Sequence, residues 1–130
     1  MRLLVTGPRT WGVIPQGVSD VSSAAAKARE ESSLLLAALD EIGPSVVIHG
    51  AAAGADTWAG LWATAKGVRQ HSSPAPFAYL GPVAGTMRNT YMLTTHRPDL
   101  VLACGEGTPG TENCVKQALL LGVPVRRIKT

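Results

Sequence analysis

Short apolar runs alternate with longer helical patterns along the whole chain of 130 residues, and this alternation limits the possible folds. The predicted strands cover residues 2–6, 45–49, 68–71, 99–104 and 123–128, and the predicted helices cover residues 20–42, 56–66, 86–96 and 111–121. A tight turn cannot join two parallel strands, whereas a helix can. Residues 1–130 are therefore predicted to form one α/β domain. Its sheet should be a doubly wound, mainly parallel, five-stranded Rossmann-like sheet with helices on both faces.

The ends of the first helix carry clear signals. Ser19 or Asp20 can cap its start, and Gly43 followed by Pro44 stops it. No apolar run is long enough to cross a bilayer, and the apolar part of MRLLVTGPR is too short for a signal peptide.

Cysteine usage and charge indicate a cytoplasmic chain. The two cysteines, Cys104 and Cys114, lack metal-type spacing, so a reduced compartment is expected, with no metal ion and no cofactor. The net charge is +3, and the one tight basic cluster is at residues 126–129. This charge is too small to indicate binding to duplex DNA, and a solvated tail explains the cluster.

Glycines and polar residues gather where the predicted strands end. The segments are TGPRTW, HGAAAGAD, GTMRN and GEGTPGT. In a parallel sheet the loops after the strands meet at one edge, where glycine lets backbone N–H groups approach a ligand and helix N-termini favour anions. The alternative is that small residues only let helices pack near the sheet. The predicted binding residues are Gly7, Arg9, Trp11, Gly50, Gly54, Asp56, Arg88, Asn89, Gly107, Gly110 and Thr111.

Several of these residues have two interpretations. Asp56 either braces the alanine loop and favours the helix dipole, or contacts ligand hydroxyls. Trp11 either stacks on a base or packs over the sheet edge. His49 either orients the loop or is a structural histidine. Trp58 and Trp62, one helical turn apart, indicate core or an oligomer face.

Two further candidates come from the last junction. GEGTPG matches GxGxxG, but the following strand, VPVRRI, lacks the acid of a dinucleotide site, so an orthodox NAD site is not expected. Glu106 could accept hydrogen bonds from ribose hydroxyls. Cys114, near a helix N-terminus, is either a thiol with a lowered pKa or a buried packing residue, and the second is favoured.

Taken in order, the four segments resemble the SLOG superfamily, which includes the DNA-processing protein DprA and the LOG phosphoribohydrolases. Within it they resemble the small YspA-like, cpYpsA-related branch, over essentially the whole chain. The resemblance implies a nucleotide-type ligand, such as a molecule derived from NAD or ADP-ribose, above the ends of the strands.

The resemblance is weakest for catalysis. LOG enzymes carry an arginine–lysine pair and a PGGxGTxxE loop. Here Arg88 matches the arginine, Asn89 replaces the lysine and Cys114 stands at the glutamate. Glu112 lies about 200° round the helix from that position, so Glu106 or Asp56 would have to supply the carboxylate. Arg88 and Glu106 are the candidate catalytic residues.

Three functions follow as expectations. The first is a sensor or sequestering protein for a small nucleotide-derived anion. The second is a nucleotide N-glycosidase, and the third is single-strand nucleic-acid binding of the DprA type. Self-association is also expected, through the alanine-rich first helix and the Trp58/Trp62 face.

Overall fold

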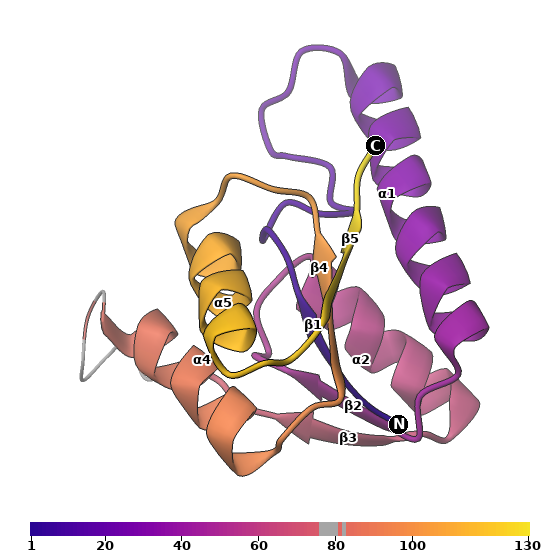
Figure 1. Ribbon diagram of the computed structural model, residues 1–130. Coiled ribbons are helices and arrows are strands. Elements are labelled where there is room, and N and C mark those ends of the chain that lie inside the picture. The colour runs from indigo at the N-terminus through magenta and orange to yellow at the C-terminus, as the bar shows by residue number, and fades with distance from the viewer. Residues whose placement is uncertain (76–80, 82) are drawn as a thin grey trace.

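The computed structural model describes residues 1–75, 81 and 83–130, and its centre is a sheet of five parallel strands in the order β3-β2-β1-β4-β5 (Figure 1). The strands are β1 (Arg2–Thr6), β2 (Val46–His49), β3 (Arg69–Ser72), β4 (Leu100–Cys104) and β5 (Val125–Ile128). All four strand pairings are parallel, so the predicted α/β fold is confirmed.

Two helices cover each face of the sheet. Helices α1 (Val21–Ile42) and α2 (Ala55–Lys66) lie on one face, and α4 (Val83–Thr95) and α5 (Pro109–Leu120) lie on the other (Figure 1). Alternate residues of the central strand β1 point to opposite faces: Leu3 and Val5 join the core under α1 and α2, whereas Leu4 joins the core under α4 and α5. This alternation explains why the central strands are apolar throughout.

The helix ends follow the local sequence. The Asp20 side chain accepts a hydrogen bond from Ser23 N at 3.0 Å, which confirms it as the N-cap of α1, and Gly43 ends this helix in the left-handed conformation with φ 58°. Helix α5 begins at Pro109, two residues earlier than predicted, because proline is favourable in the first helical turn. Helix α4 begins three residues early, at Val83. The predicted loop before it lies partly outside the described residues.

The tryptophans of α2 are used inside the protein. Trp62 is buried and donates from Nε1 to Asp40 Oδ1 at 2.9 Å, and Trp58 donates from Nε1 to the Gly12 carbonyl at 3.1 Å. Their predicted role as core is confirmed. Both rings pack against the core under α1 and α2, Trp62 buried and Trp58 partly buried, and the expected oligomer face stays a prediction.

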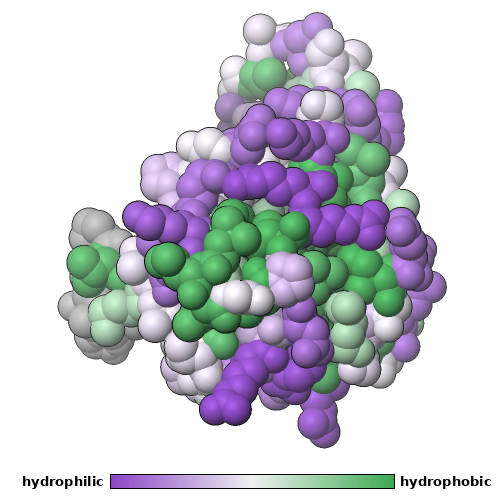
Figure 2. All heavy atoms as spheres, viewed as in Figure 1, coloured by the Kyte–Doolittle hydropathy of each residue, from purple (hydrophilic) through white to green (hydrophobic). Residues whose placement is uncertain are grey.

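Apolar side chains do reach the surface elsewhere. Leu119, Leu120 and Leu121, at the end of α5, are 55–78% exposed, and Figure 2 shows hydrophobic residues grouped on the side of the molecule that Figure 1 presents. Within the described residues, no helix combines the length and the apolar character needed to cross a membrane.

Candidate functional site

The site lies where the winding of the sheet reverses. From β1 the chain builds outward through β2 to β3, then returns to place β4 on the other side of β1 and continues to β5. The loops after β1 and β4 therefore leave the sheet in opposite directions, and such a switch point opens a crevice at the carboxyl ends of the strands. A cleft of about 520 Å³ lies there.

All four predicted segments contribute to this cleft. Of the predicted binding residues, those that line it are Gly7, Arg9, Asp56, Arg88, Asn89, Gly110 and Thr111. The prediction that these segments gather at one edge is confirmed. Gly50, Gly54, Gly107, Trp11 and Glu106 are not among the lining residues, and the reasons differ from one to the next.

The glycines after β1 and β2 serve close packing of the protein on itself. A Cβ on Gly7 would lie 2.7 Å from Ala55 Cβ and 2.8 Å from Cys104 Cβ. Gly54 has φ +78°, and a Cβ there would overlap the carbonyl oxygen of Pro8. The N-terminus of α2 is thus covered by the loop that follows β1. The expectation that Gly54 lets a ligand approach is wrong at this junction.

Asp56 braces the alanine loop. Its Oδ2 accepts hydrogen bonds from Gly50 N at 3.0 Å and from Ala52 N at 3.2 Å, and the intervening Ala51 N donates to His49 Nδ1 at 3.0 Å. Three consecutive amides are therefore satisfied within the protein, and they do not reach a ligand as the bare sequence suggests. Bracing is confirmed for Asp56, which also lines the cleft.

His49 is held as a structural part of the same loop. Because Nδ1 accepts from Ala51 N–H, the ring proton is on Nε2, which donates to Gln70 Oε1 at 3.0 Å. Burial raises the pKa of the Asp56 carboxyl, against the lowering effects of the Ala52 N–H and of the nearby Arg88. Burial dominates because Asp56 is only 5% exposed and its two donors meet a single oxygen.

Arg88 reaches from α4 across the cleft to the end of β2. Its Nη1 donates to the Gly50 carbonyl at 2.8 Å, and its Nε donates to Asn89 Oδ1 at 3.1 Å. A Cβ on Gly50 would overlap the guanidinium, so this glycine leaves room for Arg88. Both bonds go to neutral oxygens, and the carboxylate that shares the cleft with Arg88, Asp56, interacts with it only through its charge.

Asn89 holds Arg88 and α5 together. Its Nδ2 donates to the Gly110 carbonyl at 3.3 Å and to Asn113 Oδ1 at 3.1 Å, while its oxygen accepts from Arg88. The side chain is 2% exposed and has all three of its polar positions engaged. Its hydrogen bonds link Arg88 in the cleft to the first turns of α5.

The N-terminus of α5 opens into the cleft. Thr108 is the N-cap but makes no capping hydrogen bond through its side chain, and Pro109 follows in the first turn. Thr108, Pro109, Gly110 and Thr111 all line the cleft, and the space beside the Gly110 Cα is open. An uncapped helix start carries unpaired N–H groups and a partial positive charge, so this end of the cleft favours an anion.

Trp11 lies away from the cleft. Its ring is 2% exposed and belongs to the core cluster under α1 and α2. Stacking on a ligand base is therefore wrong, and packing at the sheet edge is right, because the loop after β1 folds the ring inward.

The two carboxylates of the last junction also point elsewhere. Glu106 is exposed and pairs with Lys129 Nζ at 3.1 Å, so the structure does not bring it together with Arg88 as a catalytic pair. Glu112 pairs with Arg127, on the side of α5 away from the cleft, as the helical angle predicts. Among the described residues that line the cleft, Asp56 is the only carboxylate.

Hydroxyl and amide groups complete the lining, and the sequence analysis did not select them. They are Thr6, Thr10, Thr86, Thr108 and Asn113. Thr108 stands inside the GEGTPGT segment, and Asn113 follows one helical turn after Pro109. Both positions could have been selected from the sequence, because a residue one turn after a predicted helix start lies on the same face of the helix as that start.

Neither cysteine is poised for chemistry. Burial raises the pKa of both the Cys104 and the Cys114 thiol to about 12, and in Cys114 it outweighs a hydrogen bond involving Thr6. The favoured interpretation of Cys114, a buried packing residue, is confirmed. In the described part of the chain no three metal-ligating side chains come together.

A larger hollow of about 620 Å³ adjoins the cleft at Arg88. It lies between β3 and α4, where His71 and His96 stack with ring centroids 4.4 Å apart and Tyr91 meets His96 edge-on. These rings pack against one another, whereas the 520 Å³ cleft combines the α5 N-terminus, two arginines and a carboxylate. The cleft is therefore the better candidate site.

Comparison with known proteins finds a relative from a mycobacteriophage. The chain is 32% identical over 136 residues to the "Gene 61 protein" of Mycobacterium phage D29, covering 95% of this chain and 93% of the phage protein. The chain belongs to the family of this phage protein. No protein-family model matches the sequence, and no solved structure matches it.

Proposed function

We propose that this member of the phage Gene 61 protein family binds a small nucleotide-derived anion in the cleft at the switch point, as a sensor or a sequestering protein. The observation that carries the proposal is the polarity of the cleft. One end holds the uncapped N-terminus of α5, and Arg9 and Arg88 also line the cleft, so it favours phosphate or diphosphate.

The buried carboxylate Asp56 supports the sugar part of such a ligand. A carboxylate is a hydrogen-bond acceptor, and it repels phosphate but accepts hydrogen bonds from hydroxyl groups. A ligand with both an anionic and a hydroxyl-bearing part, as in ADP-ribose or a nucleoside monophosphate, matches both kinds of lining residue. The resemblance to the SLOG superfamily points to the same ligand class and stays a prediction.

Calorimetry tests the proposal, with ADP-ribose, NAD, nucleoside monophosphates and cyclic nucleotides as titrants. Wild-type protein should bind at least one of them, and Arg88→Met should weaken that binding about 10- to 100-fold, because a charge-assisted contact is lost. Arg29→Met is the matched control, since Arg29 is exposed on α1 and does not line the cleft. Flat traces with well-folded wild-type protein would exclude the function.

An N-glycosidase is the second candidate, and Asp56 is the observation that favours it. Cleavage of an N-glycosidic bond passes through an oxocarbenium-like state that a nearby carboxylate stabilises. Because Glu106 is turned away, Asp56 would have to act, with Arg88 on the phosphate. Release of free base from AMP by wild type but not by Asp56→Asn would support this reaction, and an absence of release would reject it.

Self-association stays a separate proposal. With Trp62 buried and Trp58 partly buried, an exposed apolar surface that a second copy could cover is the leucine segment at residues 119–121. Light scattering at working concentration should give a mass above that of one chain, and a monomeric mass would end the proposal.

A further inference from the structure

The loop between β4 and α5 sets the position of the proposed anion site, yet packing holds only part of it. Gly105 and Gly107 both adopt positive φ, +68° and +89°. A Cβ on Gly107 would meet no atom within 4 Å. A Cβ on Gly105 would lie 3.4 Å from Pro8 Cγ and 3.5 Å from Trp11 Cζ3, so packing holds Gly105. Because glycine loses much conformational freedom on folding, Gly107 depends on hydrogen bonds to keep one conformation.

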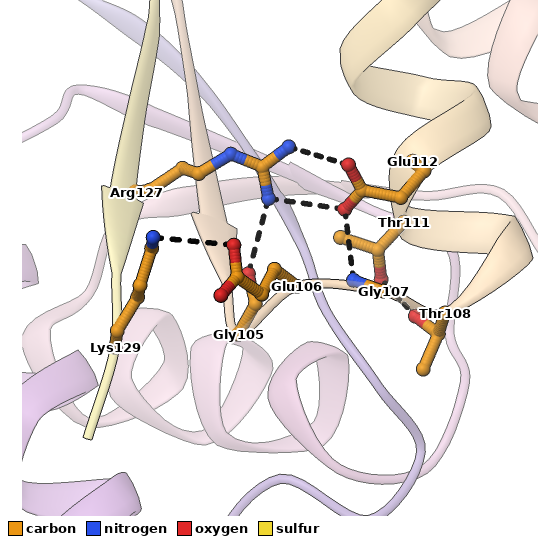
Figure 3. A network of polar contacts seen from close by, with 8 residues as sticks. All are labelled: Gly105, Glu106, Gly107, Thr108, Thr111, Glu112, Arg127 and Lys129. Atoms are coloured by element: carbon orange, nitrogen blue, oxygen red, sulfur yellow. Dashed lines mark hydrogen bonds and ion pairs between the residues drawn. The ribbon is translucent and has the colours of Figure 1, made fainter.

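Arg127 of β5 supplies those hydrogen bonds together with Glu112 of α5 (Figure 3). The guanidinium donates to Glu112 through Nη2 at 2.6 Å and Nη1 at 3.0 Å, and Nη1 also donates to the Gly105 carbonyl at 3.2 Å. The Glu112 carboxylate in turn accepts from Gly107 N at 3.2 Å. The backbone already joins Gly105 N to the Ile128 carbonyl at 2.7 Å. The ion pair adds a second contact at Gly105 and joins Gly107 to β5 and to the first turn of α5.

The geometry of this pair is that of a strong contact. Two roughly parallel N–H···O bonds from one guanidinium to one carboxylate fix orientation as well as distance. The side chains are 27% and 41% exposed, less than in the pairs Lys66–Asp40, Arg126–Glu41 and Lys129–Glu106. The hydrogen bond from Arg127 holds the pKa of Glu112 below its usual range, in keeping with an ionised carboxylate.

Arg127 also neutralises a charge in the first turn of α5. Glu112 is the acidic residue in the first turn of α5, and without a partner its carboxylate would oppose an anion at the helix N-terminus. The bidentate ion pair with Arg127 neutralises the charge of Glu112. Lys129 pairs in the same way with Glu106, the carboxylate within the loop.

We propose that Arg127 is a positioning residue of the cleft: through Glu112, Gly105 and Gly107 it fixes the loop that directs the start of α5 toward the ligand. Arg127 itself does not line the cleft. The effect on anion binding rests on the proposed function, whereas the effect on loop shape does not.

The chain offers a matched control. The neighbouring Arg126 pairs with Glu41 at 3.1 Å, but this pair touches no backbone of the loop. Arg126→Met therefore removes one partially exposed ion pair of the same kind. A charge swap, Glu112→Arg with Arg127→Glu, restores an ion pair but cannot rebuild the loop contacts. Arginine has no acceptor for Gly107 N–H, and glutamate has no donor for the Gly105 carbonyl.

Amide hydrogen exchange followed by NMR tests the proposal without any ligand. Arg127→Met should speed exchange at Gly107 about five- to tenfold and shift the amide signals of Gly110 and Thr111. The charge-swapped protein should behave in the same way, and Arg126→Met should match wild type. Unchanged exchange and shifts in Arg127→Met, or full recovery in the charge swap, would overturn the proposal. If Arg127→Met does not fold, Arg127→Lys replaces it, since lysine keeps the charge but cannot make all three bonds at once.

Titration with inorganic pyrophosphate adds the second readout. Wild type should bind it, and Arg127→Met should bind it about tenfold more weakly. The melting temperature of Arg127→Met should match that of Arg126→Met. Equal affinity in wild type and Arg127→Met would overturn the positioning role. If pyrophosphate does not bind wild type, the proposed function fails, and the exchange measurement still decides whether Arg127 fixes the loop.

Discussion

Asp56 allows a sharp test, because both amides that it receives converge on the same carboxylate oxygen. In Asp56→Asn the amide oxygen can take that position, so Gly50 N–H and Ala52 N–H keep their acceptor. In Asp56→Ala both lose it. The two variants therefore separate bracing of the loop from the charge of the carboxylate.

The magnitude follows from the burial of the donors. An unsatisfied buried donor costs about 1–3 kcal/mol, so two would cost about 2–6 kcal/mol. Gly50 is buried, but Ala52 is partly exposed at the cleft, where water can reach its amide. We therefore expect Asp56→Ala to lower the free energy of unfolding by about 2–4 kcal/mol, and Asp56→Asn to change it by less than about 1 kcal/mol.

Urea unfolding followed by circular dichroism at pH 7 measures both values. The urea midpoint should fall clearly for Asp56→Ala at a constant denaturant slope, and it should stay near wild type for Asp56→Asn. The pH adds an internal check. Because the folded pKa of Asp56 is raised, the folded state binds its proton first, so wild type should gain stability relative to Asp56→Asn as the pH falls through that pKa. Equal losses in the two variants would refute the bracing argument.

Three further predictions use other parts of the fold. Gly54→Ala should lower the free energy of unfolding by about 3 kcal/mol or more, because the alanine would have a positive φ and its Cβ would overlap the Pro8 carbonyl. In Gly110→Ala the Cβ meets open space, so the urea midpoint should be unchanged or slightly raised. Burial, His71 and Arg2 lower the pKa of His96, so the unfolded chain takes up this proton first and the stability of the fold should decrease as the pH drops below about 6.5. The urea midpoints at pH 7.5 and 5.5 should therefore differ less in His96→Asn than in wild type. An equal difference would contradict the assignment to His96. Both cysteines should resist dithiobis(nitrobenzoate) in the folded protein and react in urea, because burial raises each thiol pKa to about 12; rapid labelling of native protein would show that assignment to be wrong.

The sequence alone predicted the sheet and the edge at which the cleft forms. Both depend on local pattern: strands such as RLLVT and SVVIH read as apolar runs, and the helices between them force parallel pairing. Once the strands are parallel, every loop after a strand is at the same edge. The gathering of Gly7, Asp56, Arg88 and Gly110 needed no knowledge of distances.

Only the tertiary structure decided what each of those residues does there. The Pro8 carbonyl occupies the space beside Gly54, and the amides of the alanine loop donate to Asp56 and His49. The loop without large side chains therefore makes contacts within the protein itself. Glu106, whose position in sequence suggested catalysis, turns to Lys129. These partners come from distant segments, and sequence spacing fixes which residues share an element but not which way a side chain turns across an interface. That direction depends on packing between elements, and here it leaves the start of α5 as the open anion-favouring end of the cleft.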